Sequence, residues 1–498
     1  MTKFSALFDR LRLELILLFL LSALVVWGLP ITGSLWLDEL ISFWIIKDSP
    51  QNVFYRAFEF QGQSPLYFLI LWWTAQFNSE EWFLRLPSLI VGAFSIAIFF
   101  QVARNWLSRE AAILATLLLL GMDRVHVALF SARPYSFALF SALAATFFLV
   151  RWIERRSVGS LVLYAVCMVM TYFFHYLFIL IYCVHLLYVV LRRTTGADLR
   201  IVDFIIASCF IGIGLIPGLF QLVQLFGNKD VIDLSLALTS DSVTDAWFRT
   251  STLIPAGVAI LVGWLVAGGK VKSPQLQVVL FLTFWACMPP LLFYLLSRTI
   301  ALSIFVDRYY LWYVPGFALL LGLSLDLLER KAARQLGLLI AWLLLVVVEL
   351  GHFWHQEDWR EAIRISRENV TPDTLVLAYP GLIESQDPRW LSDAGKSDYL
   401  LAPFSYYPLE SRKILLPLNA EASNLKKYFQ EFVLPQVKLH QKLVLLSLNL
   451  RTRDPLVPDR IIFAPEYYRR LLKNEGFASR SLGNFGLVSV YLLERIVE

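Results

Sequence analysis

Most of the chain is a series of long apolar runs separated by short polar segments. A window of about 20 residues, the length that crosses a bilayer as a helix, finds about eleven such runs. They lie at 13–30, 86–103, 111–130, 134–150, 159–174, 176–191, 201–226, 251–268, 276–297, 309–328 and 335–353. A shorter run, 66–77, suits a re-entrant or interfacial helix better than a span. The pattern predicts a polytopic transmembrane helical bundle.

Positive charges in alternate loops predict the orientation of this bundle, because cytoplasmic loops carry an excess of Lys and Arg. Lys3, Arg10 and Arg12 place the N-terminus in the cytoplasm. The later basic loops contain Arg104 and Arg109, Arg151 to Arg156, Arg192 to Arg200, Lys270 and Lys272, and Arg330 to Arg334. These basic loops lie on the same side of the membrane as the N-terminus only if the 66–77 run does not cross the membrane. Residues 31–85, the turn around His175 and the tail after 354 are then extracytoplasmic.

The pattern changes after Trp354, where the apolar runs shorten to strand length. LVLAY, LVLLSLNL, RIIFA and LVSVYLL alternate with the helical, charged segments DWREAIRISREN and PEYYRRLLKNEG. This alternation predicts a small α/β domain. We therefore expect a mainly α protein with two domains, a transmembrane domain over 1–353 and an extracytoplasmic α/β domain over 354–498.

Composition supports a membrane protein and excludes a nucleic-acid-binding one. Of 498 residues, 58% are hydrophobic and 17% are charged, whereas soluble domains carry about 25% charged residues. The net charge of +5 is small for this length, and no basic stripe appears on a soluble segment. The four cysteines all lie in apolar runs without a CxxC pair, so no disulfide framework is expected.

The segment SLWLDELISFW, which follows the first predicted span, places Asp38 and Glu39 side by side among apolar residues. In the simplest interpretation they are the acidic start of a helix, where negative charge is favourable to the helix dipole. In the functional interpretation a carboxylate in a partly desolvated pocket takes a proton from a hydroxyl group.

Several ionisable residues lie at the predicted outer ends of the spans, where charge is costly and indicates function. They are Arg85, Asp123, Arg124, His126, Arg133, His175 and Arg308. Each alone could snorkel to the interface, and anionic lipid headgroups could also attract the arginines. Arginine binds phosphate bidentately, so arginines beside an acidic base indicate a substrate with a lipid tail, a phosphate and a transferable group.

Five segments in order resemble the GT-C membrane glycosyltransferases: SLWLDEL, SPLYFLILWW, EEWFLRLPSLIVG, HVALFSARPYSFALFSALAA and RYYLWYVPGFALLLGL. Within that superfamily the chain resembles the bacterial relatives of protein O-mannosyltransferases and of aminoarabinose transferases, which are glycosyltransferase family 39-like. The resemblance covers roughly residues 10–365 and includes EDWREAIRIS. It implies a polyprenyl-phosphate-linked sugar donor and transfer at the extracytoplasmic face of the bacterial inner membrane.

The resemblance also implies roles for particular residues. Asp38 corresponds to the family's catalytic base, with Glu39 as its partner. The candidates for binding the donor phosphate are Arg85, Arg133, Arg308 and His175, and the further pocket candidates are Asp123, Arg124, His126 and Tyr135. Gln63 and Ser64 stand where some members have a basic residue, so one side of the donor-phosphate site departs from the family pattern.

Two other functions are weighed against a glycosyltransferase: a lipid-linked saccharide transporter or flippase, and a membrane protein of the O-antigen ligase or polymerase type. A transporter is expected to have charges near mid-span, and a ligase to have a dense arginine cluster in its late outer loop. Neither is present in the sequence. No metal ligands are assigned, although a divalent cation held by Asp38, Glu39 and His175 is left open. The acceptor (glycan, lipid or protein) and the sugar are not specified by the sequence.

Overall fold

The computed structural model describes residues 29–197, 199–227, 247–248, 250–299, 306, 308–350, 357–371, 373–418, 423–453 and 461–496. The predicted first span at 13–30 and most of the predicted outer loop at 227–250 lie outside these residues. The chain forms two compact units. The helical unit contains Val53–Gly227 and Ser235–Phe353, and the α/β unit combines Thr32–Asn52 with Trp354–Glu498.

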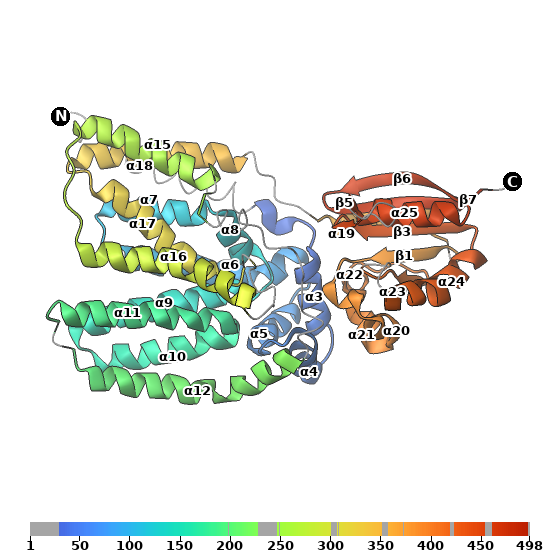
Figure 1. Ribbon diagram of the computed structural model, residues 1–498, viewed down its shortest axis with the longest axis horizontal. Coiled ribbons are helices and arrows are strands. Elements are labelled where there is room, and N and C mark those ends of the chain that lie inside the picture. Colours follow the sequence, from blue (N-terminus) through green and yellow to red (C-terminus); the bar gives the residue numbers. More distant parts are fainter. Residues whose placement is uncertain are drawn as a thin grey trace. The chain divides into compact units, whose positions relative to one another are not determined.

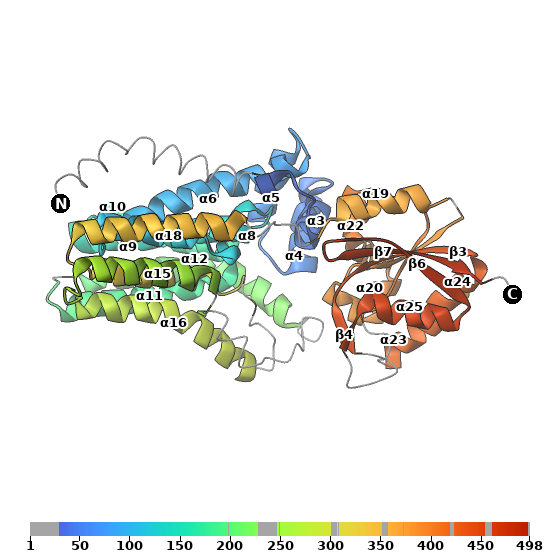
Figure 2. The same cartoon turned by 90° about the horizontal axis from the view of Figure 1, so that it is seen from above.

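The helical unit is a bundle of mostly long helices (Figures 1 and 2). Its elements are α4 (Pro50–Gln61, which begins in the other unit), α5 (Leu66–Ala75), α6 (Glu81–Ala103), α7 (Arg109–Leu120), α8 (Asp123–Phe130), α9 (Tyr135–Arg155), α10 (Val158–Phe174), η3 (Tyr176–Leu180), α11 (Ile181–Thr194), α12 (Ile201–Gly227), α15 (Thr250–Ala267), α16 (Leu276–Thr299), η4 (Leu311–Tyr313), α17 (Val314–Asp326) and α18 (Lys331–Leu350). Helix α9 packs against α6 and α10, α7 packs against α17, and α15 packs against α18.

Among the described residues, six helices are long and apolar enough to cross a membrane, or seven if α7 and α8, bent by 74°, form one span. Each predicted segment from 86–103 to 335–353 coincides with a helix or with two consecutive helices. Several of these, including α10 and α17, are apolar but shorter. The polytopic bundle is therefore confirmed, while the total of about eleven spans and the non-crossing course of α5 stay predictions.

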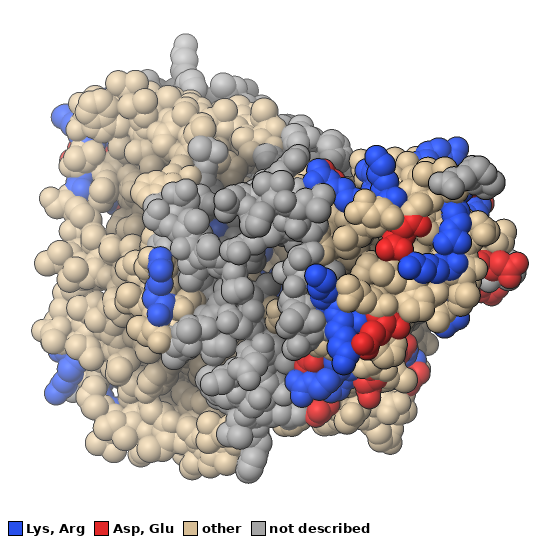
Figure 3. Space-filling model, turned by 45° about the vertical axis from the view of Figure 1, so that its right-hand side comes forward, with Lys and Arg blue, Asp and Glu red and all other residues tan. Residues whose placement is uncertain are grey.

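The bundle has apolar side chains on its outside and polar groups within, as a bilayer environment requires. Val162, Ile205, Phe210 and Leu265 are each more than half exposed. Buried inside are the hydroxyls of Ser88, Ser95, Ser136, Ser141 and Thr146 and the ring of His185. In Figure 3 the visible surface of the bundle is almost free of charge, whereas Lys, Arg, Asp and Glu cover the visible face of the α/β unit.

A glycine lets α17 approach its neighbour closely. A Cβ atom at Gly316 would lie 2.5 Å from Cγ of Trp285 on α16, which is closer than side chains pack. The Trp285 indole N–H donates to the main-chain oxygen of Trp312 at 2.8 Å. These contacts hold the segment after Arg308 against the bundle.

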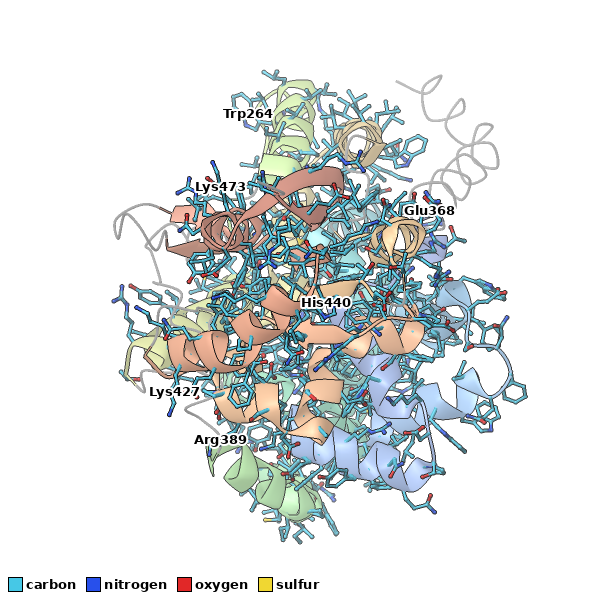
Figure 4. All side chains as sticks on the ribbon, turned by 90° about the vertical axis from the view of Figure 1, so that its right-hand side faces the viewer. Trp264, Glu368, Arg389, Lys427, His440 and Lys473 are labelled. Atoms are coloured by element: carbon cyan, nitrogen blue, oxygen red, sulfur yellow. The ribbon has the colours of Figure 1, made fainter. Side chains whose placement is uncertain are left out.

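The α/β unit is built on a five-stranded mixed sheet with the order β2-β1-β3-β7-β6. The strands are β1 (Leu375–Tyr379), β2 (Lys413–Leu415), β3 (Lys442–Leu448), β6 (Phe477–Phe485) and β7 (Val488–Arg495), with a separate pair, β4 (Arg451–Arg453) and β5 (Ile461–Phe463). β1 is parallel to β2 and β3, and β7 is antiparallel to β3 and β6. Helices α19 (Trp359–Asn369) and α25 (Ala464–Asn474) lie on opposite faces of the sheet (Figures 2 and 4).

Shorter helical segments complete the α/β unit. They are α3 (Leu37–Ile46), η5 (Ile383–Gln386), α20 (Pro388–Ser392), α21 (Ala394–Leu400), α22 (Ala402–Tyr406), α23 (Ser423–Tyr428), the π-helix η6 (Phe429–Val433) and α24 (Leu434–Leu439), while η2 (Leu29–Thr32) lies at the boundary between the two units. The predicted α/β character and all the predicted strands and helices of the tail are confirmed. Strands β2, β4 and β6 were not predicted: β2 and β4 have only three residues each, and β6 is largely polar and contains an irregularity between Ser481 and Gly483.

Candidate functional site

The predicted acidic pair lies in the first turn of α3. Glu39 is only 1% exposed, and its Oε2 atom accepts the main-chain N–H of Trp36 at 3.2 Å. Asp38 is half-buried. The acidic helix start considered as the simplest interpretation is therefore present, and Glu39 stabilises it by satisfying a main-chain donor that the helix leaves open. The two neighbouring carboxylates therefore differ: Glu39 is buried and hydrogen-bonded to the main chain of Trp36, whereas Asp38 is half-buried.

A third carboxylate, Glu357, holds the start of α3. Its Oε2 atom accepts the main-chain N–H of Leu37 at 2.8 Å and the indole N–H of Trp359 at 2.8 Å. Glu357 is itself fixed to the sheet, since it forms an antiparallel bridge with Gly486 at the β6–β7 turn. Leu37, the residue before Asp38, is therefore hydrogen-bonded to a glutamate that pairs with the β6–β7 turn of the central sheet.

The remainder of the loop is attached to the same unit at its other end. The Trp44 indole N–H donates to Oδ2 of Asp398 at 2.7 Å, and the Lys47 ammonium group lies 2.9 Å from the same atom. The Trp44 ring also contacts the Tyr399 ring edge-on at 5.3 Å. Further hydrogen bonds join Leu35 to Tyr407, and Ser34 to Arg360. Sequence reasoning did not predict that the compact α/β unit includes Thr32–Asn52.

The carboxyl groups around the start of α3 influence one another. Burial raises the pKa of Glu357 to about 7, hydrogen bonds from Trp359 and Leu37 oppose that rise, and the negative charges of Asp38 and Glu39 add to it. Glu357 was not among the predicted site residues, although it opens the EDWREAIRIS segment of the resemblance.

A fourth carboxyl group, Glu384 in η5, is also near. Burial raises its pKa to about 7, hydrogen bonds from its own main chain and from Tyr399 oppose the rise, and the charge of Asp38 adds to it. The Tyr399 hydroxyl donates to Glu384 Oε1 at 3.2 Å. Nothing in the local sequence singles this residue out, because the fold alone brings η5 near α3.

These carboxylates do not form a metal site. In the part of the chain that the structure describes, no three His, Cys, Asp or Glu side chains are arranged to hold an ion. The divalent cation left open by the sequence gains no support from this geometry and stays a prediction.

In the helical unit, the predicted residues Arg133, His175 and Arg308 come together around two tyrosines, one of which, Tyr135, was itself predicted. The Arg133 guanidinium lies 5.8 Å from the Tyr135 ring centre, and Arg308 lies 5.7 Å from that of Tyr309. The His175 ring lies between the two tyrosines, 5.3 Å from Tyr135 and 5.6 Å from Tyr309. Three segments distant in sequence thus place two cations beside one imidazole.

His175 has unused hydrogen-bonding capacity at this point. It lies in the turn between α10 and η3 and is 3% exposed. Within the described part of the chain, neither ring nitrogen has a hydrogen-bond partner. Burial lowers the pKa of His175, and the positive charges of Arg133 and Arg308 lower it further. A buried neutral imidazole with open ring nitrogens beside two guanidinium charges suits an anionic ligand.

Other predicted residues make contacts nearby. Arg124 is buried, donates to the Tyr313 hydroxyl at 2.8 Å, and lies 5.8 Å from the Tyr310 ring centre. His126 is 1% exposed and packs against Phe130. Asp123 begins α8, but its side chain lies outside the described residues.

The fourth predicted phosphate ligand, Arg85, has a different environment. It is 4% exposed and donates to the main-chain oxygen of Ile31 at 2.9 Å. One turn further along α6, the Ser88 hydroxyl contacts the main-chain oxygen of Arg133 at 3.4 Å. The structure therefore connects α6 to the Arg133 turn through Ser88, while Arg85 contacts the chain just before the acidic loop.

Comparison with known proteins identifies the fold. Residues 62–216 match the family model described as dolichyl-phosphate-mannose-protein mannosyltransferase. The crystal structure of ArnT from Cupriavidus metallidurans in the apo state matches with a TM-score of 0.55 and 15% identity, over 97% of this chain and 98% of ArnT. ArnT from the same organism bound to undecaprenyl phosphate matches with a TM-score of 0.53 and 14% identity, over 96% and 98% of the two chains. No curated protein matches the sequence.

The chain therefore has the GT-C fold of membrane glycosyltransferases, and the resemblance predicted from the sequence is confirmed. More particularly, it has the ArnT arrangement of a multi-pass helical bundle followed by a C-terminal α/β region.

Proposed function

We propose that this protein is a glycosyltransferase that moves a sugar from a polyprenyl phosphate to an acceptor hydroxyl at the extracytoplasmic face of the membrane. The observation that carries the proposal is the cluster of Arg133, His175 and Arg308, in which two guanidinium charges lie near a buried imidazole whose ring nitrogens are open within the described residues. The solved ArnT with bound undecaprenyl phosphate supports this class of donor. The apolar bundle provides an environment for the lipid tail.

In the proposed mechanism Asp38 takes the proton from the acceptor hydroxyl as that oxygen bonds to the anomeric carbon. The bond from the anomeric carbon to the phosphate oxygen breaks, and its electron pair leaves on the polyprenyl phosphate. Arg133 and Arg308 stabilise this developing negative charge, which is the largest electrostatic demand of the reaction. A single displacement of this kind inverts the configuration at the anomeric carbon.

The other residues of the acidic loop have a supporting part in this proposal. Glu39 closes the first turn of α3 through Trp36, and Glu357 fixes Leu37. Together they restrict the position of the Asp38 main chain, which is what a general base needs in order to meet a hydroxyl at hydrogen-bond distance. Arg85, Arg124, His126 and Tyr135 are proposed to line the donor side.

The experiment is a transfer assay with purified protein and an undecaprenyl-phosphate sugar, in which products are detected by mass spectrometry. A general base contributes about 10²- to 10⁴-fold to the rate, so the Asp38→Asn variant is expected to lose that factor. Asp48→Asn is the matched control, because Asp48 is exposed just after the same helix. Wild-type turnover by Asp38→Asn would remove Asp38 as the base, and accumulation of donor in sealed vesicles without product would favour a transporter.

The proposed orientation has its own test. Single cysteines at Ser157, before α10, and at Ser397, in α21, are expected to react oppositely with a membrane-impermeant maleimide in intact inverted vesicles. Ser157 is expected to be labelled there because its loop carries Arg151 to Arg156 and is predicted to be cytoplasmic. Labelling of both from the same side would contradict the proposed topology.

A further inference from the structure

The α/β unit contains a pocket of about 820 Å³ between α25 and the β6–β7 hairpin. Its polar lining includes Asn449, Arg469, Lys473, Ser479, Asn484 and Tyr491. Lys473, labelled in Figure 4, marks the α25 side of the sheet. The volume lies within the range of small-molecule sites, which is roughly 300–1,000 Å³.

Arg469 is held in a fixed orientation inside this pocket. Its guanidinium carbon lies 4.5 Å from the centre of the Tyr491 ring, and its Nε donates to the Ser479 hydroxyl at 2.9 Å. Stacking and this bond constrain the plane of the guanidinium while the two terminal nitrogens remain as donors. A planar, oriented guanidinium is suited to bidentate binding of a carboxylate or phosphate.

Another part of the lining is suited to hydroxyl groups. Ser489 is 1% exposed, and its hydroxyl contacts Oδ1 of Asn449 at 2.8 Å and Oδ1 of Asn484 at 2.6 Å. Because a hydroxyl has a single proton, Ser489 donates to one of these amides and accepts from the NH₂ group of the other, which leaves one amide NH₂ group and one amide oxygen for a ligand. An aromatic ring, an oriented cation and two amides form a lining typical of sugar recognition.

The charge of the lining specifies the ligand further. Glu466 is the acidic side chain of the pocket, and it forms an ion pair with Arg470. Arg469 and Lys473 are then left without an acidic counterpart in the lining. A neutral saccharide would leave both cations unmatched, so the pocket favours a saccharide that carries negative charge.

We infer that this pocket binds an anionic saccharide as part of the acceptor, a role that rests on the proposed glycosyltransferase function. The connection to the reaction is structural. Asn484 and Ser489 flank the β6–β7 turn, and Phe485 in this turn accepts the main-chain N–H of Asp358 at 3.1 Å. The same turn pairs with Glu357, which bonds Leu37 beside Asp38. A saccharide in the pocket would thereby contact the same β6–β7 turn that, through Glu357, fixes the segment that carries Asp38.

The experiment measures saccharide binding to the full-length protein in detergent by isothermal titration calorimetry. The probes are digalacturonic acid, glucose 1-phosphate, the neutral disaccharide digalactose, and inorganic phosphate. Wild type is expected to bind at least one charged sugar about tenfold or more tightly than digalactose. The two charged sugars distinguish a carboxylate from a phosphate, and tight binding of inorganic phosphate alone would show an anion site without sugar recognition.

Variants locate the binding to this pocket. Arg469→Ala is expected to weaken binding of the charged sugar about 10- to 100-fold, because it removes a charge-assisted bidentate contact, and Arg469→Lys is expected to restore it only in part. Arg364→Ala is the matched control on α19, since Arg364 is exposed and pairs with Glu361 and Glu368 on the other face of the sheet. Equal affinity of Arg469→Ala and wild type, or no binding of any probe to wild type, would overturn the inference.

A second readout separates this inference from the proposed function. Release of free sugar from undecaprenyl-phosphate sugar in the absence of acceptor reports only on the donor side. Arg469→Ala is expected to retain this release while it loses binding of the charged sugar. Sugar binding without any activity toward the donor would contradict the glycosyltransferase proposal but would support the saccharide site. Donor activity without sugar binding would support the glycosyltransferase proposal but would contradict the saccharide site.

Discussion

The two units hold charged groups of opposite sign, and they stabilise them in different ways. In the helical unit, Arg133 and Arg308 stack on tyrosine rings beside His175. In the α/β unit, Glu39 and Glu357 accept main-chain N–H groups at the start of α3. The helical unit thus contains a cationic cluster around Arg133 and Arg308, here called the cationic half, and the α/β unit contains an acidic cluster around Asp38, Glu39 and Glu357, here called the acidic half. The sequence analysis assigned Asp38 and Glu39 to the transmembrane domain over 1–353, whereas the compact α/β unit includes Thr32–Asn52.

A large effect is expected when the cationic half is changed. Arg133→Ala is expected to lower kcat/KM by about 10²- to 10³-fold, because it removes an electrostatic contact to the departing phosphate, and Arg308→Ala is expected to act in the same direction. The measurement is transfer from an undecaprenyl-phosphate sugar. Arg298→Ala is the matched control, since Arg298 also lies over a tyrosine ring, that of Tyr294, but is exposed.

The replacement of both arginines gives a sharper version of this test. If Arg133 and Arg308 contact the same phosphate, the double variant is expected to lose less than the product of the two single effects, since groups that act as a unit are not additive. Fully multiplicative losses would show that the two arginines act at separate places.

A smaller effect is expected in the acidic half. Glu357→Ala is expected to lower kcat by about 10- to 100-fold, because it releases Leu37 and displaces Asp38. Glu357→Gln keeps an oxygen acceptor and is expected to recover part of the rate. The KM for the donor is expected to stay unchanged in both variants. Glu368→Gln, at an exposed residue of α19, is the control.

A merely structural role of Glu357 would give a different result. In that case Glu357→Ala and Glu357→Gln would lower the melting temperature and the amount of active protein without changing kcat per active site. A changed donor KM at unchanged kcat would place Glu357 in the cationic half instead, and would contradict the division described above.

The smallest expected effect concerns stability and pH. The raised pKa of Glu384, about 7, means that the folded protein holds this proton between its ordinary pKa of 4.5 and about 7, where the unfolded chain releases it. Glu384 therefore lowers stability progressively as pH rises through that interval. Glu384→Gln is expected to remove this pH-dependent loss of stability. The melting temperature of the variant is therefore expected to rise relative to that of wild type from pH 5 to pH 7. A difference independent of pH would contradict the assigned pKa.

Much of this architecture follows from the order of apolar and polar residues. The runs that became α6, α9, α12 and α16 are long and nearly free of charge, so that only a helical bundle in a bilayer accommodates them. The tail strands β1 and β3 are short apolar runs bounded by polar residues and were equally predictable. Strand β6 was not, because its partner β7, and not its own pattern, determines its conformation.

The candidate site was predictable only in part. Arg133, His175 and Arg308 were found because ionisable residues at the edge of a membrane are costly. Glu357 and Glu384 were missed because carboxylates in a polar, soluble segment are ordinary, and only tertiary contacts bring them near Asp38. The attachment of Thr32–Asn52 to the C-terminal residues depends on hydrogen bonds across more than 300 positions, such as that between Leu37 and Glu357, separated by 320. No local pattern encodes such contacts.

The most direct test of the division between the two halves is one pair of titrations with undecaprenyl phosphate, followed for each variant by the transfer assay. The account predicts that Asp38→Asn binds undecaprenyl phosphate with the wild-type Kd but does not transfer sugar, and that Arg133→Ala binds it at least about tenfold more weakly. Wild-type affinity in Arg133→Ala together with weakened affinity in Asp38→Asn would contradict the account.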